Sequence, residues 1–86
     1  MFYVYMLKSI TTGIKKTYVG YTNDIALRLI KHNNGTGAKS TKGYKWIVIF
    51  KKKFQTKSPA MSFEYQLKNN KKLRSELLSK YDNSSK

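Results

Sequence analysis

The chain has 86 residues and no cysteine, and 18 lysine and arginine residues against four aspartate and glutamate residues give it a formal net charge of +14. This length suits one small domain, and the missing cysteines exclude a disulfide framework and thiolate chemistry. A hydrophobic content of 40% predicts a folded domain and not a disordered polycation. The charge predicts a polyanionic partner, above all nucleic acid. The alternative is that the basic residues serve only to keep the surface soluble.

The apolar runs are all far shorter than the roughly 20 residues that a membrane helix needs. No charged segment with a small-residue cleavage site precedes the first of these runs, which excludes a signal peptide. We therefore expect a cytoplasmic protein that does not interact with a membrane.

The first half of the chain predicts a strand, a turn, a strand and a helix. Residues 2–7 and 16–21 are rich in the aromatic and β-branched residues typical of strands, and between them Gly13 is free to take a positive φ in a hairpin connection. The following helix is expected to be capped by Thr22 or Asn23, to carry Asp24 in its first turn, and to run to about Asn33 before Gly35 ends it.

The second half predicts a loop, a strand and two helices. Residues 34–43 lack periodicity and are expected to form a surface loop, and 46–54 form the third strand. Ser58 is the expected N-cap of the next helix, with Pro59 in its first position and an end near Asn69 or Asn70. A short helix over 72–80 should follow, and residues 82–86 should fray, leaving a single domain over 1–81.

Three polar residues of the first predicted helix share one flank. Asp24, Arg28 and His32 follow one another at intervals of four residues, beside an apolar stripe formed by Ile25 and Leu29. This spacing holds a guanidinium and the single imidazole of the chain close together. Taken singly, His32 is also explained by the helix dipole and Arg28 as an ordinary surface cation.

Glu64 falls within the apolar stripe of the second predicted helix, between Ala60, Phe63 and Leu67. A carboxylate in that position needs a partner, and a salt bridge to Arg28 or to a lysine would satisfy it. The functional alternative is a Mg²⁺ ligand, because Mg²⁺ commonly takes one protein carboxylate, several waters and phosphate oxygens.

Two tyrosine tripeptides, Tyr3-Val4-Tyr5 and Tyr18-Val19-Gly20, fall on the first two predicted strands. Because side chains alternate along a strand, Tyr3 and Tyr5 share one face of the first strand, and Tyr18 and Gly20 share one face of the second. Two phenols can then meet across the hairpin, and Gly20 leaves space beside them. Packing of two phenols for their bulk is the structural alternative.

The two tripeptides, followed by Arg28, His32 and Glu64, resemble the GIY-YIG nuclease family over about residues 2–68. The likeness is closest to its small standalone members and to the catalytic module of the eukaryotic structure-specific endonuclease subunit. The resemblance implies an α+β fold, with a three-stranded antiparallel sheet flanked by helices in the order β-β-α-β-α-α. It also implies one divalent cation, Mg²⁺ or Mn²⁺, and hydrolysis of DNA, branched or repair-intermediate DNA included, to 5′-phosphate and 3′-hydroxyl ends.

The resemblance also assigns roles to five residues. Tyr18 matches the tyrosine that helps to activate the attacking water, and Tyr5 matches its companion. Arg28 matches the guanidinium on the scissile phosphate, His32 the auxiliary proton acceptor or phosphate contact, and Glu64 the metal ligand. A phenol is a poor base at neutral pH, so Tyr18 would depend on the metal, on Arg28 or on His32.

Substrate contacts are expected from basic residues after the first helix, namely Lys39, Lys42, Lys45, Lys51, Lys52 and Lys53. DNA is the expected partner, with RNA as the alternative. Two other functions fit the same sequence. One is a non-catalytic nucleic-acid-binding module, and the other is a subunit that acts only with a protein scaffold, for which Leu27 and Ile30 offer an exposed apolar contact.

Overall fold

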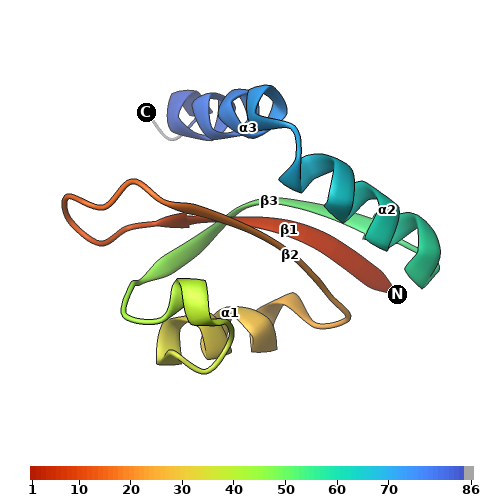
Figure 1. Cartoon of the computed structure of the whole chain (residues 1–86), viewed down its shortest axis with the longest axis horizontal. Helices are drawn as coiled ribbons and strands as arrows, with labels where there is room; N and C mark the ends of the chain where they lie inside the picture. The colour runs from red at the N-terminus through yellow and green to blue at the C-terminus, as the bar shows by residue number, and fades with distance from the viewer. Residues whose placement is uncertain (85–86) are drawn as a thin grey trace.

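A three-stranded antiparallel sheet lies between two layers of helices (Figure 1). The computed structural model of the chain describes residues 1–84. The strands are β1 (Phe2–Ser9), β2 (Thr17–Thr22) and β3 (Trp46–Phe54), with β1 in the centre of the order β2-β1-β3. The helices are α1 (Ile25–Asn34), the short 3-10 helix η1 (Lys39–Thr41), α2 (Lys57–Lys68) and α3 (Lys71–Ser84). The predicted α+β class and the predicted order of elements are confirmed.

Each face of the central strand belongs to a different core, because successive side chains of a strand point to opposite sides. Val4 and Met6 pack with Ala60 and Leu67 of α2, on the face that α2 and α3 cover in Figure 1. Tyr5 and Leu7 belong to a second core on the face of α1 and η1, together with Trp46, Ile25 and Leu29. The two faces of the sheet therefore contribute to two separate cores, and Tyr5 lies on the face that α1 covers.

The hairpin between β1 and β2 decides which residues of the tyrosine tripeptides lie opposite one another. Tyr5 pairs with Gly20, and Leu7 pairs with Tyr18. The connection contains Gly13 with a φ of 79°, as its sequence predicted, because glycine takes this backbone conformation without steric cost. This register places Tyr18 and Gly20 on the same face of the sheet as Tyr5.

Helix α1 begins one or two residues later than predicted. Its N-cap is Asp24, whose side chain accepts a hydrogen bond from the backbone N–H of Leu27 over 3.0 Å. Thr22 ends β2 instead, and its Oγ1 accepts a hydrogen bond from the backbone N–H of Asp24. The predicted cap at Thr22 or Asn23 is therefore wrong, whereas Gly35 ends the helix in the left-handed conformation as expected.

Helix α2 begins at Lys57 with Thr56 as its N-cap, so the predicted cap at Ser58 is wrong. Pro59 is the third helical residue and not the first. Proline is tolerated at this third position because none of the first four N–H groups of a helix has an intrahelical partner. A residue without an N–H therefore fits anywhere in the first turn.

Helix α3 is longer than predicted and reaches Ser84. Lys8 of β1 binds Asp82 at 2.8 Å, so a tertiary ion pair lies within the segment that was expected to fray. Residues 82–84 are helical, and the rest of the predicted tail, residues 85 and 86, lies outside the described residues. None of the helices within residues 1–84 combines the length and the apolar character that crossing a bilayer requires.

Candidate active site

Tyr5 lies at the centre of a cluster of polar side chains on the α1 face of the sheet. Its side chain is 1% exposed, and its ring lies 6.3 Å from that of Tyr18, centroid to centroid. Gly20 makes this packing possible, because a Cβ at that position would lie 2.5 Å from the Oη of Tyr5 and 2.9 Å from the Cε2 of Tyr18. The predicted meeting of two phenols across the hairpin, with space provided by Gly20, is confirmed.

His32 is fully buried and not simply a polar residue at the end of a helix. Its Nε2 lies 2.9 Å from the Oη of Tyr5, and its Nδ1 lies 2.9 Å from the Oγ1 of Thr41. Its ring also lies 4.8 Å from that of Tyr18, centroid to centroid. Each nitrogen of the imidazole therefore has one hydroxyl partner, as a buried polar group requires.

The partners of Thr41 decide which nitrogen of His32 carries the proton. Thr41 donates its hydroxyl hydrogen to the carbonyl oxygen of Ala38 over 3.0 Å. A hydroxyl has one hydrogen, so Thr41 must accept the hydrogen bond from His32, and Nδ1 is then the protonated nitrogen. Nε2 is left with its lone pair, which accepts the hydroxyl proton of Tyr5. The chain of hydrogen bonds runs in one direction, from Tyr5 through His32 to the backbone.

Two residues that hold His32 were missed from the sequence. Thr41 lies in the segment predicted to be an exposed loop but is fully buried in η1, and its carbonyl accepts a hydrogen bond from the indole of Trp46. Gly37 packs against the imidazole, since a Cβ there would lie 2.7 Å from the Nδ1 of His32. No signal in the sequence pointed to either residue, because the sequence did not indicate that His32 is buried.

Arg28 extends the cluster toward the surface. Hydrogen bonding to the phenol of Tyr5 is the main cause that raises the pKa of Arg28 above its ordinary value, with a smaller contribution from Tyr18. The Nε of the guanidinium is buried and has no hydrogen-bond partner within residues 1–84. Arg28 also lines a hollow of about 300 Å³ next to Tyr21 and Asn23. A buried N–H donor without a partner suits an anionic oxygen.

Burial and charge keep the histidine neutral and the buried phenol protonated at neutral pH. Burial, aided by the positive charge of Arg28, lowers the pKa of His32 below its ordinary value. Burial is also the main cause that raises the pKa of Tyr5, and Arg28 opposes it. At neutral pH Tyr5 therefore keeps its proton and donates it in a hydrogen bond to the neutral imidazole of His32.

Glu64 lies on α2 with its side chain 18% exposed, flanked by the buried Ala60 and Leu67 as the sequence predicted. Its Oε2 lies 3.6 Å from the Nζ of Lys68, so the predicted salt bridge is formed with a lysine one helical turn away. The negative charge of Glu64 also contributes to the raised pKa of Tyr5, although weakly. The carboxylate of α2 therefore acts electrostatically on the same cluster as Arg28.

The donor set fits Mg²⁺ better than a metal held by several side chains. No group of three or more histidine, cysteine, aspartate or glutamate side chains that could hold a metal ion occurs in the described part of the chain. Zinc sites need three or four such ligands, whereas Mg²⁺ often takes one or two carboxylates and completes its shell with water and phosphate. Glu64 of α2, whose charge contributes to the raised pKa of Tyr5, is the carboxylate that could serve.

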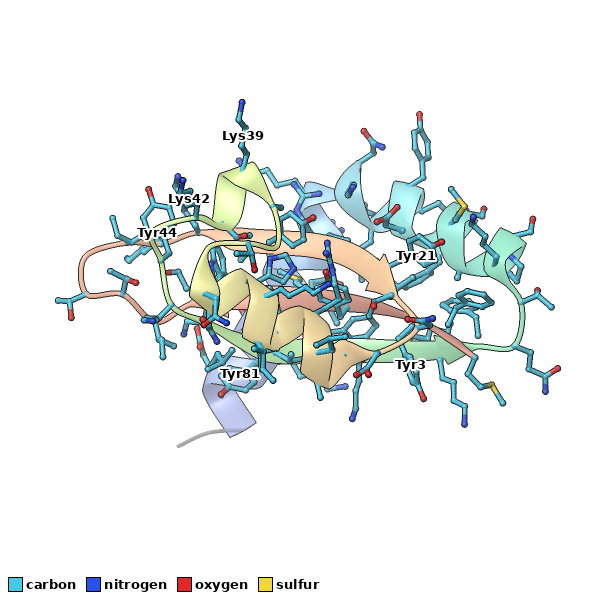
Figure 2. All side chains as sticks on the ribbon, turned by 90° about the horizontal axis from the view of Figure 1, so that it is seen from below. Tyr3, Tyr21, Lys39, Lys42, Tyr44 and Tyr81 are labelled. Atoms are coloured by element: carbon cyan, nitrogen blue, oxygen red, sulfur yellow. The ribbon has the colours of Figure 1, made fainter. Side chains whose placement is uncertain are left out.

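The six lysines expected to contact substrate do not gather in one place. Lys39 and Lys42 project from η1 and the residue after it, on the side of the molecule where β2 lies (Figure 2). Lys51, Lys52 and Lys53 belong to β3, the strand on the other side of β1. Lys45 lies between these groups in the chain and donates to the carbonyl oxygen of Asn33. Their role in binding stays a prediction.

The sequence of this chain matches the model of a known protein family. The family model that describes the GIY-YIG catalytic domain matches residues 1–81. The chain belongs to the GIY-YIG family. Its two tyrosine tripeptides are those of β1 and β2, and the fold found here is the one that the resemblance implied.

The relatives of this GIY-YIG chain include small bacterial proteins. It is 42% identical over 67 residues to a UPF0213 protein of Staphylococcus saprophyticus, a match that covers 77% of this chain and 78% of the relative. A UPF0213 protein of Oceanobacillus iheyensis is 43% identical over 67 residues, covering 77% and 74% of the two chains. The solution NMR structure of a UPF0213 protein from Bacillus halodurans matches with a TM-score of 0.51 and 33% identity, over 93% of this chain and 84% of that one.

Membership of the GIY-YIG family gives the cluster a general chemical meaning. Members of the family are endonucleases that act on DNA, and this chain carries their catalytic domain over nearly its whole length. The chain therefore has a nuclease-type domain.

Proposed function

We propose that this chain is a Mg²⁺-dependent endonuclease, with Mn²⁺ as a substitute, that hydrolyses DNA to 5′-phosphate and 3′-hydroxyl ends. One observation carries the proposal. Tyr5, Tyr18, Arg28 and His32 form a single cluster on one face of the sheet, and the charge of Glu64 acts on it from α2. A phosphodiesterase needs these parts, namely a phosphate-binding cation, a proton acceptor and a carboxylate for a metal.

Arg28 is proposed to bind the scissile phosphate. The Nε of Arg28 is buried and lacks a partner within residues 1–84. The residue also lines a surface hollow that a phosphate oxygen can enter. Negative charge grows on the phosphoryl oxygens as the attacking oxygen approaches, and a fixed guanidinium stabilises that charge more than it stabilises the ground state.

The chain of hydrogen bonds through His32 is proposed to orient Arg28. Because Tyr5 donates its hydroxyl proton to His32, the lone pairs of its oxygen remain available to the guanidinium of Arg28. His32 is fully buried, so it acts on the phosphate through Tyr5 and not by direct contact. It is a positioning residue.

Tyr18 is proposed to contact the attacking water. It is the more exposed of the two phenols, lines a hollow at the edge of the sheet and interacts with Arg28. The water oxygen forms a bond to phosphorus while the bond from phosphorus to the 3′ oxygen breaks. As the oxygen of Tyr18 accepts the proton of the water, its hydroxyl releases its own proton to solvent, and the 3′ oxygen leaves with a proton from solvent.

Glu64 is proposed to hold the metal ion. Its carboxylate is paired with a half-exposed lysine one helical turn away. Surface ion pairs at this spacing contribute only about 0.3–0.5 kcal/mol to stability, so a divalent cation can displace the lysine. When bound, Mg²⁺ supplies positive charge beside the phosphate and favours departure of the leaving oxygen.

Cleavage of labelled DNA tests this proposal. Duplex, flap, junction and single-stranded substrates are incubated with the protein and Mg²⁺, or with a chelator. We expect cleavage with Mg²⁺ and none with the chelator, and the Arg28→Ala and Glu64→Ala variants should be inactive. Both should still bind DNA, because phosphate contacts are spread over many lysines.

Lys57→Ala serves as the matched control, since Lys57 is exposed at the far end of α2 from Lys68. It should cleave like the wild type. Cleavage by Arg28→Ala and Glu64→Ala at the wild-type rate would refute the assignment of the site. Binding of DNA by the wild type without cleavage of any substrate would favour the alternative, a non-catalytic nucleic-acid-binding module.

A further inference from the structure

Strand β2 is an edge of the sheet, and hollows follow one another along it. The first, beside Tyr21 and Thr22, contains Arg28. The second contains Tyr18 and Thr17 together with Lys68 and Arg74, from α2 and α3. The third, about 420 Å³ in volume, again contains Thr17 and Arg74 and extends to Lys15 and Lys71. Because the second and third hollows share two residues, they form one continuous path away from Tyr18.

The third hollow has a basic rim. Lys15, Lys16, Lys71 and Arg74 line it. The only acidic residue among the described residues that line it is Asp82, which pairs with Lys8 at 2.8 Å. Lys15 and Lys71 have exposed side chains, and neither takes part in an ion pair within residues 1–84.

Arg74 joins this rim to the neighbouring hollow as a fixed charge. Its Nη1 donates to the carbonyl oxygen of Leu67 over 2.8 Å and also to that of Lys68. The guanidinium is thereby held at the end of α2, between the two hollows. A cation whose position is already fixed loses little conformational freedom when a phosphate binds.

The floor of the third hollow is apolar, since Met6, Ile14 and Leu78 also line it. A site for free phosphate alone would not need such a floor. A nucleotide has both parts, a phosphate for the basic rim and a sugar or base with an apolar face for the floor. A base can lie on this floor only when it is not stacked in a duplex.

We propose that the substrate strand leaves the catalytic cluster along the edge of β2 and places an unpaired nucleotide in the hollow between the β1–β2 connection and α3. This inference rests on the proposed function and adds to it the form of the substrate, DNA that is single-stranded beside the cleavage site.

The opposite edge of the sheet is a poorer path. The hollow that contains Lys51 of β3 is otherwise lined by Ala26 and by apolar residues such as Ile25 and Val48. The central strand β1 separates β3 from Tyr18. Two lysines of β3, Lys51 and Lys53, therefore give a matched comparison, because they are exposed and their replacement changes the net charge equally.

The experiment compares K15Q/K71Q with K51Q/K53Q in chelator, so that DNA is bound and not cut. Binding of a single-stranded oligonucleotide, a flap and a blunt duplex is measured over a range of salt concentrations. Each lost contact with a single strand reduces the slope of log affinity against log salt by about 0.7. We expect K15Q/K71Q to reduce the slope by about 1.4 for the single strand and the flap and to weaken their binding at least tenfold. K51Q/K53Q tests the β3 lysines that the sequence predicted as substrate contacts. If the strand follows β2 instead, this variant should change the slope and the affinity much less, and the blunt duplex should distinguish the variants least.

Equal losses in the two variants, or a loss as large for blunt duplex as for the flap, would overturn the inference. Cleavage by the wild type is measured separately with Mg²⁺. If the wild type cuts DNA but the two variants bind alike, the strand path is wrong and the nuclease proposal stands. If the wild type does not cut but K15Q/K71Q alone binds the single strand weakly, the strand path stands and the nuclease proposal fails.

Discussion

The Oγ1 of Thr41 lies 2.9 Å from the Nδ1 of His32 and 3.0 Å from the carbonyl oxygen of Ala38. The second bond uses the only hydrogen of the hydroxyl, so the first must be donated by the imidazole. A short segment outside the tyrosine strands thereby fixes the proton on Nδ1 and turns the lone pair of Nε2 toward Tyr5.

Thr41→Val should reduce cleavage at least about tenfold, because valine has the shape of threonine but cannot fix the tautomer of His32. It should also lower the free energy of unfolding by about 1–3 kcal/mol, since a buried N–H loses its partner. Thr41→Ser keeps the hydroxyl and should restore most of the activity. Measured rates that are equal for the valine and serine variants would show that the hydroxyl has no role in catalysis.

Gly20→Ala should reduce both stability and cleavage. The added Cβ would lie 2.5 Å from the Oη of Tyr5 and would push the phenols apart, and overpacking of this kind costs about 1–3 kcal/mol. Gly13→Ala is the control, because its Cβ meets no atom within 4 Å and only its φ of 79° is unfavourable. That variant should lose stability but cut DNA at the wild-type rate per folded molecule, as chemical denaturation and cleavage assays can establish.

The stability of the protein should depend on pH through His32 in the mildly acidic range. Its pKa is lowered by burial and by Arg28, so below about pH 6.5 the unfolded chain binds a proton that the folded chain does not. Stability contributed by the neutral imidazole is therefore complete above about pH 6.5 and decreases toward the lowered pKa, by at most about 1.4 kcal/mol per pH unit.

This pH window can be assigned, because the chain contains one histidine and carboxylates titrate lower, near about pH 4. Chemical denaturation of the wild type and of His32→Gln between about pH 5.5 and about pH 7.5, about one unit on either side of the ordinary histidine value, measures the effect. The variant should lack the slope. Cleavage should persist at about pH 6.5 and decline only below it. A decline that begins above this pH would contradict the proposal that His32 acts as a neutral imidazole.

Mg²⁺ should raise the unfolding temperature of the wild type but not of Glu64→Gln. A ligand at ten times its dissociation constant adds about 1.4 kcal/mol to the stability of the folded state. Lys68→Met should bind the ion more tightly than the wild type, because it removes the cation that lies 3.6 Å from Glu64. An equal shift in Glu64→Gln and the wild type would place the ion elsewhere.

Leu27→Asp should change the free energy of unfolding by less than about 0.5 kcal/mol, because surface substitutions rarely do more. Leu27 is 48% exposed on α1 and Ile30 is 56% exposed, as the sequence predicted for a contact with a scaffold. Leu29 packs against the core beneath the same helix, so Leu29→Asp should destabilise the fold by several kcal/mol. Denaturant titration separates the two, and a large loss with Leu27→Asp would mean that this side chain is needed by the fold itself.

The order of the elements and part of the site could be predicted from the sequence. Alternation along the two tyrosine strands predicted that two phenols could meet across the hairpin, and the spacing of four residues placed Arg28 and His32 on one flank of α1. The position of Glu64 inside an apolar stripe predicted its lysine partner in general terms. These features repeat with the period of a strand or a helix, so neighbouring residues encode them.

What the tertiary structure decided is which distant groups meet. The local sequence does not specify that Thr41 reaches His32, that Asp82 reaches Lys8, or that the basic hollow lies along β2 and not along β3. The sequence alone thus determined the strands, the helices and the residues able to carry out the chemistry. Packing of the two helical layers on the sheet determined their partners, because contacts across many residues depend on the whole fold and leave no periodic pattern in the chain.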